Sequence, residues 1–179
     1  MKEISLDILR QKAAKIKWFF CDIDGTLTDG GVYYSPEGEL LKRFSLRDGT
    51  GFFLLRQCGI KAGFITTENS PIVEQRAKKL KIDKYIFGTN RKVEAMKEFL
   101  ASEGFSMENV AFIGDELNDV KLLNVCGLSF AVGDADYRAK ESADVVCDHF
   151  GGHGAFREAV ERLLNLRDVN IDNIIEQSL

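Results

Sequence analysis

Short apolar runs alternate along this chain with longer segments whose apolar residues recur every three or four positions. The short runs, rich in aromatic and β-branched residues, predict strands at 16–20, 62–66, 84–87, 110–114, 128–132 and 144–147. The longer segments predict helices at 49–58, 69–80, 92–103, 117–125 and 154–164. Most of the predicted strands are apolar on both faces, which favours a parallel sheet with helices on both sides. The alternation therefore predicts an α/β fold with a doubly wound, mostly parallel sheet.

Residues 31–46 interrupt this alternation. Two β-rich arms flank the sequence Ser35-Pro36-Glu37-Gly38, whose proline and glycine are typical of a turn, so the segment predicts a β-hairpin. A length of 179 residues matches one domain, and no linker or repeat divides the chain. We therefore expect a single domain over 1–179, with its core at about 16–165, the hairpin at 31–46 and an amphipathic tail at 166–179.

Composition and charge exclude several classes of partner. Lys and Arg total 24 against 28 Asp and Glu, a net charge of −4, which disfavours nucleic-acid binding because that requires a basic surface. The longest apolar run, 18–21, is far shorter than the roughly 18 residues of a membrane span. The N-terminal residues lack the continuous apolar core of a signal peptide, and the four cysteines form no CxxC pair. We expect a cytoplasmic protein with no nucleic-acid or membrane partner.

Polar residues follow four of the predicted strands, at the edge where an open α/β sheet binds its ligand. They are Asp22-Ile23-Asp24-Gly25-Thr26, then Thr66-Thr67-Glu68, then Lys92 at the start of a helix, and last Gly114-Asp115-Glu116-Leu117-Asn118-Asp119. Each group alone is a weak signal, because acidic residues and threonines at loop starts often cap helices or face solvent. Their occurrence at four strand ends in succession predicts one active site.

In this order, the chain's D-x-D-G-T after an apolar strand, its Thr, its Lys and its final G-D-E-x-x-D resemble the haloacid dehalogenase superfamily of aspartyl-phosphate phosphatases. The resemblance covers about 17–164. It is sharper at 21–30, at 44–51 (FSLRDGTG) and at 151–158 (GGHGAFRE), which look like the small phosphatases of 2-keto-3-deoxy sugar-acid phosphates. Those enzymes act on 3-deoxy-octulosonate 8-phosphate or on nonulosonate 9-phosphates of the sialic-acid type.

The resemblance implies a role for each residue of the predicted site. Asp22 would be the nucleophile that forms an aspartyl-phosphate, and Asp24 the acid and base that moves protons. Mg²⁺ would be held by the Asp22 carboxylate, the Asp24 backbone carbonyl and Asp115, which suits its preference for oxygen ligands. The phosphate would be neutralised by Lys92 and bound by Thr66, Thr67 and backbone N–H groups.

The last acidic motif departs from the usual pattern of the superfamily. Asp115-Glu116 stands where Asp-Asp is more common, and Glu116 is one methylene longer. We expect Glu116 to hold a metal-bound water rather than the metal itself. Asp119 is expected to support the neighbouring loop or Lys92.

The substrate prediction depends on Glu68, which stands with Thr67 and Asn69 where octulosonate phosphatases typically carry Gly-Arg. Glu68 is either an acid favoured by the start of a helix or an acceptor for sugar hydroxyls. Lys79 lies eleven residues on, about 16 Å along a helix, so it could reach Glu68 or substrate only from another subunit. This pairing is similar to the nonulosonate branch, so we expect a nonulosonate 9-phosphate, with octulosonate 8-phosphate as the alternative.

Three basic residues near the hairpin have less specific interpretations. Arg47 is expected to meet the substrate carboxylate, although a salt bridge within its loop is an equal alternative. Lys42 and Arg43 are expected to be exposed on the hairpin arm.

The sequence leaves no room for a cap domain over the site, because 28–63 holds the hairpin and one helix and 67–91 holds one helix and one strand. The resemblance implies that hairpins of adjacent subunits close each other's sites in a homotetramer. The apolar hairpin residues Val32, Tyr33 and Tyr34 would have no core to join in a monomer.

Two other functions remain open. A phospho-accepting receiver also combines an acidic metal pocket with Thr and Lys, but its accepting Asp follows a central strand rather than the first motif. A catalytically silent oligomerisation domain of the same fold is the other alternative, which intact motif residues disfavour. Hydrolysis of an aryl phosphate with and without Mg²⁺ separates all three.

Overall fold

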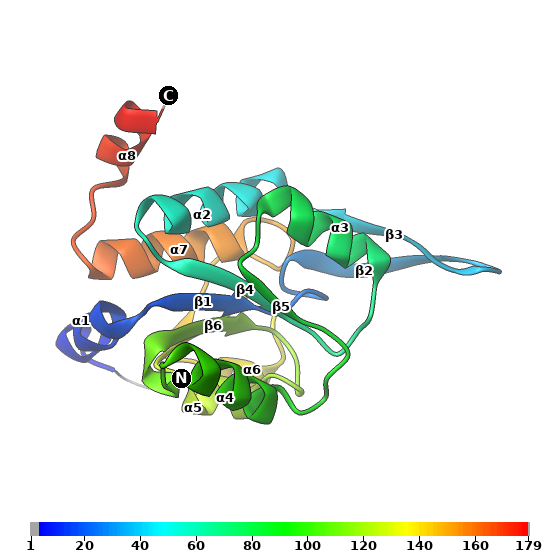
Figure 1. Ribbon diagram of the computed structural model, residues 1–179, viewed down its shortest axis with the longest axis horizontal. Coiled ribbons are helices and arrows are strands. Elements are labelled where there is room, and N and C mark those ends of the chain that lie inside the picture. Colours follow the sequence, from blue (N-terminus) through cyan, green and yellow to red (C-terminus); the bar gives the residue numbers. More distant parts are fainter. Residues whose placement is uncertain (1–3, 179) are drawn as a thin grey trace.

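The strands of the computed structural model, which describes residues 4–178, form one six-stranded parallel sheet and a separate two-stranded ribbon (Figure 1). The order across the large sheet is β5-β4-β1-β6-β7-β8. The bounds of these strands are β1 Trp18–Cys21, β4 Lys61–Ile65, β5 Lys84–Ile86, β6 Val110–Gly114, β7 Leu128–Ala131 and β8 Val145–Val146. The order reverses at β1, so the loop that follows this strand opens at the switch point where α/β sheets bind ligands.

Helices cover both faces of the sheet. One side carries α2 (Leu46–Gln57), α3 (Pro71–Leu80) and α7 (Ala155–Leu166), and the other carries α4 (Lys92–Glu103), α5 (Val120–Val125) and α6 (Tyr137–Ser142) (Figure 1). The chain begins with α1 (Leu6–Lys15) and ends with α8 (Ile171–Ser178), and the short helix η1 (Met107–Asn109) precedes β6. No helix among residues 4–178 is long and apolar enough to cross a membrane.

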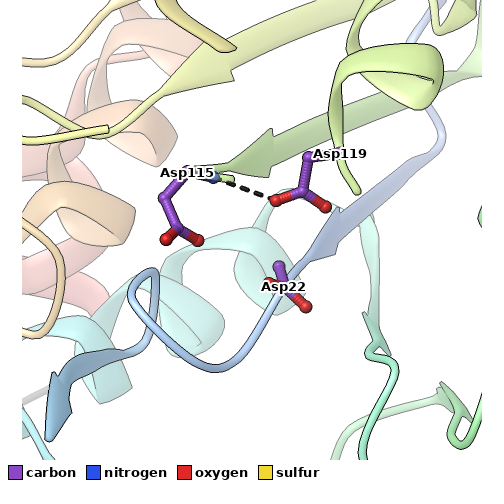
Figure 2. A group of neighbouring side chains, drawn as sticks. All are labelled: Asp22, Asp115 and Asp119. Atoms are coloured by element: carbon purple, nitrogen blue, oxygen red, sulfur yellow. Dashed lines mark hydrogen bonds between the residues drawn. The ribbon is translucent and has the colours of Figure 1, made fainter. Parts of the chain in front are cut away.

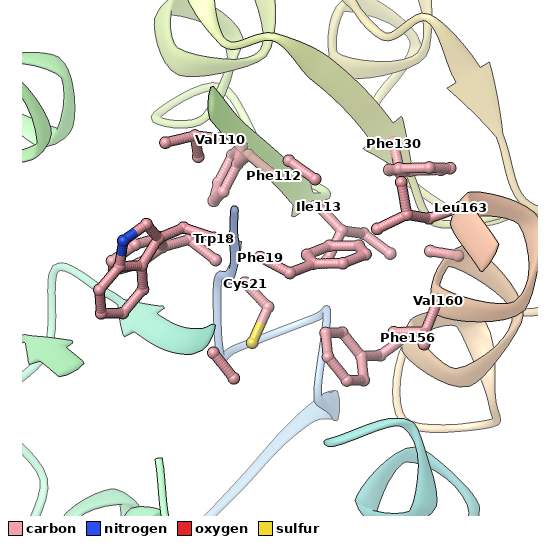
Figure 3. Close-up of a cluster of buried hydrophobic side chains, with 14 of the residues drawn as sticks. Trp18, Phe19, Cys21, Val110, Phe112, Ile113, Phe130, Phe156, Val160 and Leu163 are labelled. Atoms are coloured by element: carbon pink, nitrogen blue, oxygen red, sulfur yellow. The ribbon is translucent and has the colours of Figure 1, made fainter. Parts of the chain in front are cut away.

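The core forms around β1, because this strand lies between β4 and β6 and is buried on both faces. Phe19 stacks against Phe130 with ring centroids 5.6 Å apart and lies 5.3 Å from Phe156, which joins the sheet to α7 (Figure 3). Burial of a Phe or Leu side chain contributes about 1.5–3 kcal/mol. The end of β1, and the loop that follows it, are therefore anchored by the largest apolar cluster of the fold.

The predicted strands and helices are confirmed, with differences at their ends that have local causes. Helix α2 begins at Leu46, earlier than predicted, because the Ser45 side chain accepts the N–H of Arg47 as an N-cap. Helix α5 begins only at Val120. Helices α1, η1 and α6 were not predicted, and α8 lies in the segment that was expected only as an amphipathic tail. Helix α6 spans six residues, too short for an apolar period to be visible, and starts at the Asp136 cap.

The predicted hairpin is present as β2 (Thr28–Ser35) and β3 (Gly38–Phe44), which project from the body of the protein (Figure 1). Its side chains are largely exposed: Tyr33 by 61%, Tyr34 by 71% and Leu41 by 57%. The ribbon pairs only with itself among the described strands. Its position relative to the sheet therefore depends on side-chain contacts near its base.

Candidate active site

Loops after three strands and the face of the hairpin meet around one cavity of about 340 Å³. Most of its lining residues are polar, and it lies at the carboxyl edge of the large sheet, where most of the predicted site residues converge. The lining residues are Asp22, Asp24, Gly25, Gly30, Val32, Tyr34, Glu39, Lys42, Thr66, Thr67, Glu68, Asp115, Glu116 and Asn118.

Lys92 joins the carboxylate of Asp22, which lines the cavity, to that of Asp119. Lys92 and Asp119 are not among the lining residues, and the three buried side chains together are called the floor of the site. The Lys92 ammonium nitrogen lies 2.9 Å from Asp22 Oδ1 and 2.7 Å from Asp119 Oδ1, and all three side chains are at most 5% exposed. Burial lowers the pKa of Lys92, but the two carboxylates outweigh burial and raise it, so the ammonium stays charged. Burial raises the pKa of Asp22 well above its ordinary value, and Asp119 adds to the rise against the opposing effect of Lys92.

Asp119 also organises the loop after β6. Its Oδ2 atom accepts the backbone N–H of Asp115 at 3.0 Å and that of Glu116 at 3.3 Å. Both oxygens of Asp119 are therefore engaged, and the residue is fully buried. The Glu116 carboxylate accepts the N–H of Leu117 at 2.7 Å, so its longer side chain turns back onto its own loop while the residue still lines the cavity.

Asp115 faces the loop after β1. Thr26 donates its hydroxyl proton to Asp115 Oδ1 at 2.7 Å. Gly25 has a φ of +85°, and a Cβ atom there would lie 2.0 Å from Asp115 Oδ2, so only glycine allows this approach. Burial raises the pKa of Asp115 to about 7, with the Thr26 hydrogen bond opposing the rise and Asp119 adding to it. Gly151, in the predicted GGHGAFRE motif, packs beneath this loop, where a Cβ atom would lie 1.7 Å from the Gly25 carbonyl oxygen.

The three carboxylates of Asp22, Asp115 and Asp119 surround one space (Figure 2). One oxygen from each lies within 4.8 Å of the others, a spacing that could hold a metal ion. Since both Asp119 oxygens already accept hydrogen bonds, Asp22 and Asp115 are the better placed ligands. Three carboxylates face one ammonium, and burial raises the pKa of both Asp22 and Asp115. A divalent cation with oxygen ligands fits this shortage of positive charge.

The loop after β4 supplies the other wall. Thr66 is buried, and its hydroxyl accepts the N–H of Glu68 at 3.2 Å. Thr67 is half-buried and Glu68 is exposed, and both line the cavity.

The structure does not bring Arg47 or Lys79 of this chain to the cavity. Arg47 lines a separate cavity of about 350 Å³ together with Arg157 and Glu161. Lys79 is exposed on α3 and is absent from the cavity lining. Contact of either residue with substrate in the same subunit has no support from this geometry.

Lys42 was missed, and the expectation that it is exposed on the hairpin arm is wrong. Its side chain is 2% exposed, and its ammonium forms ion pairs with Asp24 Oδ1 and, at 2.7 Å, with Glu39 Oε1. Arg43, by contrast, is exposed as expected, although it bonds the Gly152 carbonyl oxygen at 3.1 Å. The contact of Lys42 with Asp24 links β3 to a loop 18 residues away in sequence, and no local pattern could have revealed it.

Known proteins are similar to this chain in sequence and in fold. The sequence model of the haloacid dehalogenase-like hydrolases matches residues 62–157. The 3-deoxy-D-manno-octulosonate 8-phosphate phosphatase of Haemophilus influenzae is 36% identical over 156 residues, which cover 87% of this chain and 87% of that protein.

Two solved structures show the same arrangement of elements. The cobalt-bound form of the Haemophilus influenzae phosphatase has a TM-score of 0.84 at 36% identity, covering 88% of this chain and 92% of that one. The 3-deoxy-D-manno-octulosonate 8-phosphate phosphatase of Moraxella catarrhalis, solved with magnesium ion, phosphate ion and KDO, has a TM-score of 0.91 at 34% identity. That match covers 98% of this chain and 100% of the other.

Proposed function

Because the chain belongs to the haloacid dehalogenase-like hydrolases, as one of their capless sugar-acid phosphatases, we propose that it hydrolyses 3-deoxy-D-manno-octulosonate 8-phosphate. The observation that carries this proposal is similarity over nearly the whole chain to a phosphatase solved with magnesium, phosphate and KDO. The cavity supports it, since about 340 Å³ suits a small ligand and its lining carboxylate Asp22 is paired with the buried Lys92.

Asp22 and Asp24 divide the chemistry between them. A carboxylate oxygen of Asp22 attacks phosphorus, the bond from phosphorus to the sugar oxygen breaks, and that oxygen takes the proton of the Asp24 carboxyl. In the second half, Asp24 takes a proton from water as the water oxygen attacks phosphorus. This step releases inorganic phosphate and restores the Asp22 carboxylate.

The remaining residues bind the metal ion and the phosphate and neutralise the phosphate charge. Mg²⁺ would be held by Asp22, Asp115 and the backbone carbonyl of Asp24, and when bound it supplies positive charge toward the phosphate oxygens. Lys92 holds Asp22 in place and neutralises the phosphate, which Thr66 and Thr67 hydrogen-bond from the opposite wall. Asp119 fixes Lys92 and the Asp115 loop rather than taking a position on the metal.

A nonulosonate 9-phosphate is the second candidate substrate, and Glu68 is the observation that favours it. This carboxylate lines the cavity at the position where octulosonate phosphatases typically carry Gly-Arg, and it can accept hydrogen bonds from a longer hydroxyl chain. The similarity to named octulosonate phosphatases supports the eight-carbon substrate more strongly.

Catalytic efficiency on the two esters decides between these substrates. We expect the native protein to release phosphate faster from octulosonate 8-phosphate than from nonulosonate 9-phosphates, with Mg²⁺ required for both. Glu68→Arg is the matched variant, expected to alter the ratio of the two efficiencies. A native preference for the nine-carbon ester would replace the first candidate by the second, and no hydrolysis of either would reject both.

The partner of the hairpin is a second copy of this chain. Val32, Tyr33, Tyr34 and Leu41 are exposed by 45% or more, which is costly for a cluster of this size on a free surface. A homotetramer in which hairpins cover neighbouring sites would bury them and exclude water from the reaction. Sedimentation at assay concentration tests this assembly, and a fully active monomer would contradict it.

A further inference from the structure

Asp24 has one partner that fixes its side chain. Lys42 forms an ion pair with Asp24 Oδ1, whereas Asp24 Oδ2 is buried without a hydrogen-bond partner among residues 4–178. The Asp24 side chain is 32% exposed and lines the cavity, so it could rotate toward solvent without this contact. A carboxylate held through a single oxygen depends strongly on the group that holds it.

A β-bulge places Lys42 and Glu39 on the same face of the hairpin. Residues three apart on a regular strand point to opposite faces of the sheet. In this hairpin Tyr33 pairs with Leu41 but Tyr34 pairs with Glu39, so Leu40 is an extra residue on β3. The extra residue places Glu39 and Lys42 on the same face of the ribbon, as the cross-strand partners of Tyr34 and Val32. On this face the Glu39 and Lys42 side chains form an ion pair.

Glu39 extends this contact to a second loop of the site. Its other oxygen, Oε2, accepts the hydroxyl of Ser70, a buried residue that precedes α3 at the end of the loop after β4. A continuous series of polar contacts thus runs from Asp24 through Lys42 and Glu39 to Ser70. It joins the loop after β1, the hairpin and the loop after β4, which all line one cavity.

We propose that Lys42 is a positioning residue for Asp24, and that the hairpin sets the acid–base group of its own subunit through the Lys42–Glu39–Ser70 contacts. This inference rests on the proposed function, in which Asp24 protonates the leaving oxygen. Lys42 does not touch the reacting atoms. Its ammonium holds one carboxylate oxygen and thereby fixes the orientation of the Asp24 side chain in the cavity lining.

Leaving-group dependence separates this role from a structural one. A proton from Asp24 matters most for a basic leaving group and least for an acidic one. We would measure kcat/KM on phenyl, nitrophenyl and dinitrophenyl phosphate, which lack the sugar, for the native protein and for Lys42→Met. We expect a loss of at least about 10-fold on the phenyl ester, with the roughly 10²–10⁴-fold that a positioned acid contributes as the upper bound. On the dinitrophenyl ester we expect kcat/KM to fall by less than about threefold, since that leaving group departs without a proton.

Three further variants complete the test. The slope of log kcat/KM against leaving-group pKa measures the leaving-group dependence. Asp24→Asn should give the steepest slope, and Glu39→Gln, which leaves Lys42 in place, should steepen it by less. Lys97→Met removes an exposed lysine on α4 and should leave the slope at the native value.

Each outcome either supports or overturns the inference. A steeper slope in Lys42→Met and in Glu39→Gln supports it. An equal loss on all three esters, or no change, overturns it while leaving the proposed function intact, provided that Asp24→Asn steepens the slope. A native protein without Mg²⁺-dependent hydrolysis, or an unchanged slope in Asp24→Asn, rejects the proposed roles and this inference together.

Discussion

The floor of the site and the hairpin above it are built in opposite ways. On the floor, the side chains of Asp22, Lys92 and Asp119 are at most 5% exposed. The Lys92 ammonium lies 2.9 Å from the Asp22 carboxylate and 2.7 Å from that of Asp119. On the hairpin, Tyr33 and Tyr34 are 61% and 71% exposed. The floor is anchored by central strands that pair on both sides, whereas the ribbon pairs only with itself among the described strands.

The rigid floor therefore suits the catalytic groups, and the exposed hairpin suits contacts that can vary. Charge chemistry needs groups that cannot relax, because an unpaired buried charge is costly and displaced ligands lose catalysis. A ribbon held to the body by a few side chains, such as Lys42 on Asp24 and Arg43 on Gly152, can change its exposed residues freely. Substitutions on the floor should therefore act strongly, and substitutions on the outer hairpin face should act weakly on the subunit itself.

Asp22→Asn tests the floor at its most sensitive position. We expect no measurable phosphate release, because the attacking oxygen is lost while the amide keeps the size of the side chain. Phosphate release and acid-quenched trapping of the phosphoenzyme measure this, with far-ultraviolet circular dichroism to show that the variant is folded. Hydrolysis at the native rate would remove Asp22 from the mechanism.

Lys92→Met tests whether the floor also stabilises the fold. We expect the free energy of unfolding of the metal-free protein to fall by about 3–5 kcal/mol, because loss of one partner leaves buried carboxylates unpaired. Urea unfolding measures the change. Lys97→Met is the matched control, expected to stay within about 0.5 kcal/mol of the native value. A similar small change in Lys92→Met would show that the floor is solvated rather than dry.

Mg²⁺ should stabilise the floor by supplying the missing positive charge. At a free Mg²⁺ concentration of about 100 times its Kd, we expect the free energy of unfolding to rise by about 2.7 kcal/mol. Affinity should weaken as pH falls below about 7, the raised pKa of Asp115, because a proton then competes with the metal. Asp115→Asn should remove most of the gain, whereas Asp172→Asn, on exposed α8, should keep it. Equal gains in both variants would place the ion elsewhere.

Glu158, on α7, tests the junction between the two regions, because it accepts the N–H groups of the loop at 148–149, and this loop continues to Gly152, which bonds Arg43 of the hairpin. Burial raises the pKa of Glu158, but the N–H groups of Asp148 and His149, the His149 side chain and Arg162 outweigh burial and lower it. Its stabilisation is therefore present above the ordinary pKa of 4.5 and is lost as pH falls through the lower folded value. We expect Glu158→Gln to cost about 1.5 kcal/mol at neutral pH. The deficit should shrink in acid, and a deficit independent of pH would contradict this account.

The outer hairpin face should show the smallest effect on the subunit. Tyr33 and Leu41 form a cross-strand pair on the face away from the cavity lining. We expect the double variant Tyr33→Ser with Leu41→Ser to change the free energy of unfolding of the isolated subunit by less than about 0.5 kcal/mol. The same variant should dissociate the proposed tetramer in sedimentation. A loss above about 2 kcal/mol would mean that these residues support the subunit's own core.

Much of the site could be predicted because the topology of a parallel sheet does most of the placement. Asp22, Thr66, Lys92 and Asp115 each follow an apolar strand or open the next helix, which local patterns reveal. Parallel strands bring their carboxyl ends to one edge whatever the side chains are. The helix at 92–103 and the strand at 110–114 coincide with α4 and β6, because long periodic or wholly apolar segments leave little ambiguity.

The sequence by itself determined the fold class, the hairpin and the identity of the residues at the strand ends, since all of these follow from short-range patterns of apolar and polar residues. Only the tertiary structure decided that Lys42 holds Asp24, that Glu39 reaches Ser70 and that Arg47 lies at another cavity. The physical reason is the orientation of the ribbon. It depends on two register shifts within the hairpin, one of them at Leu40, and on contacts between residues 18 and 31 positions apart, which leave no periodic trace in the chain.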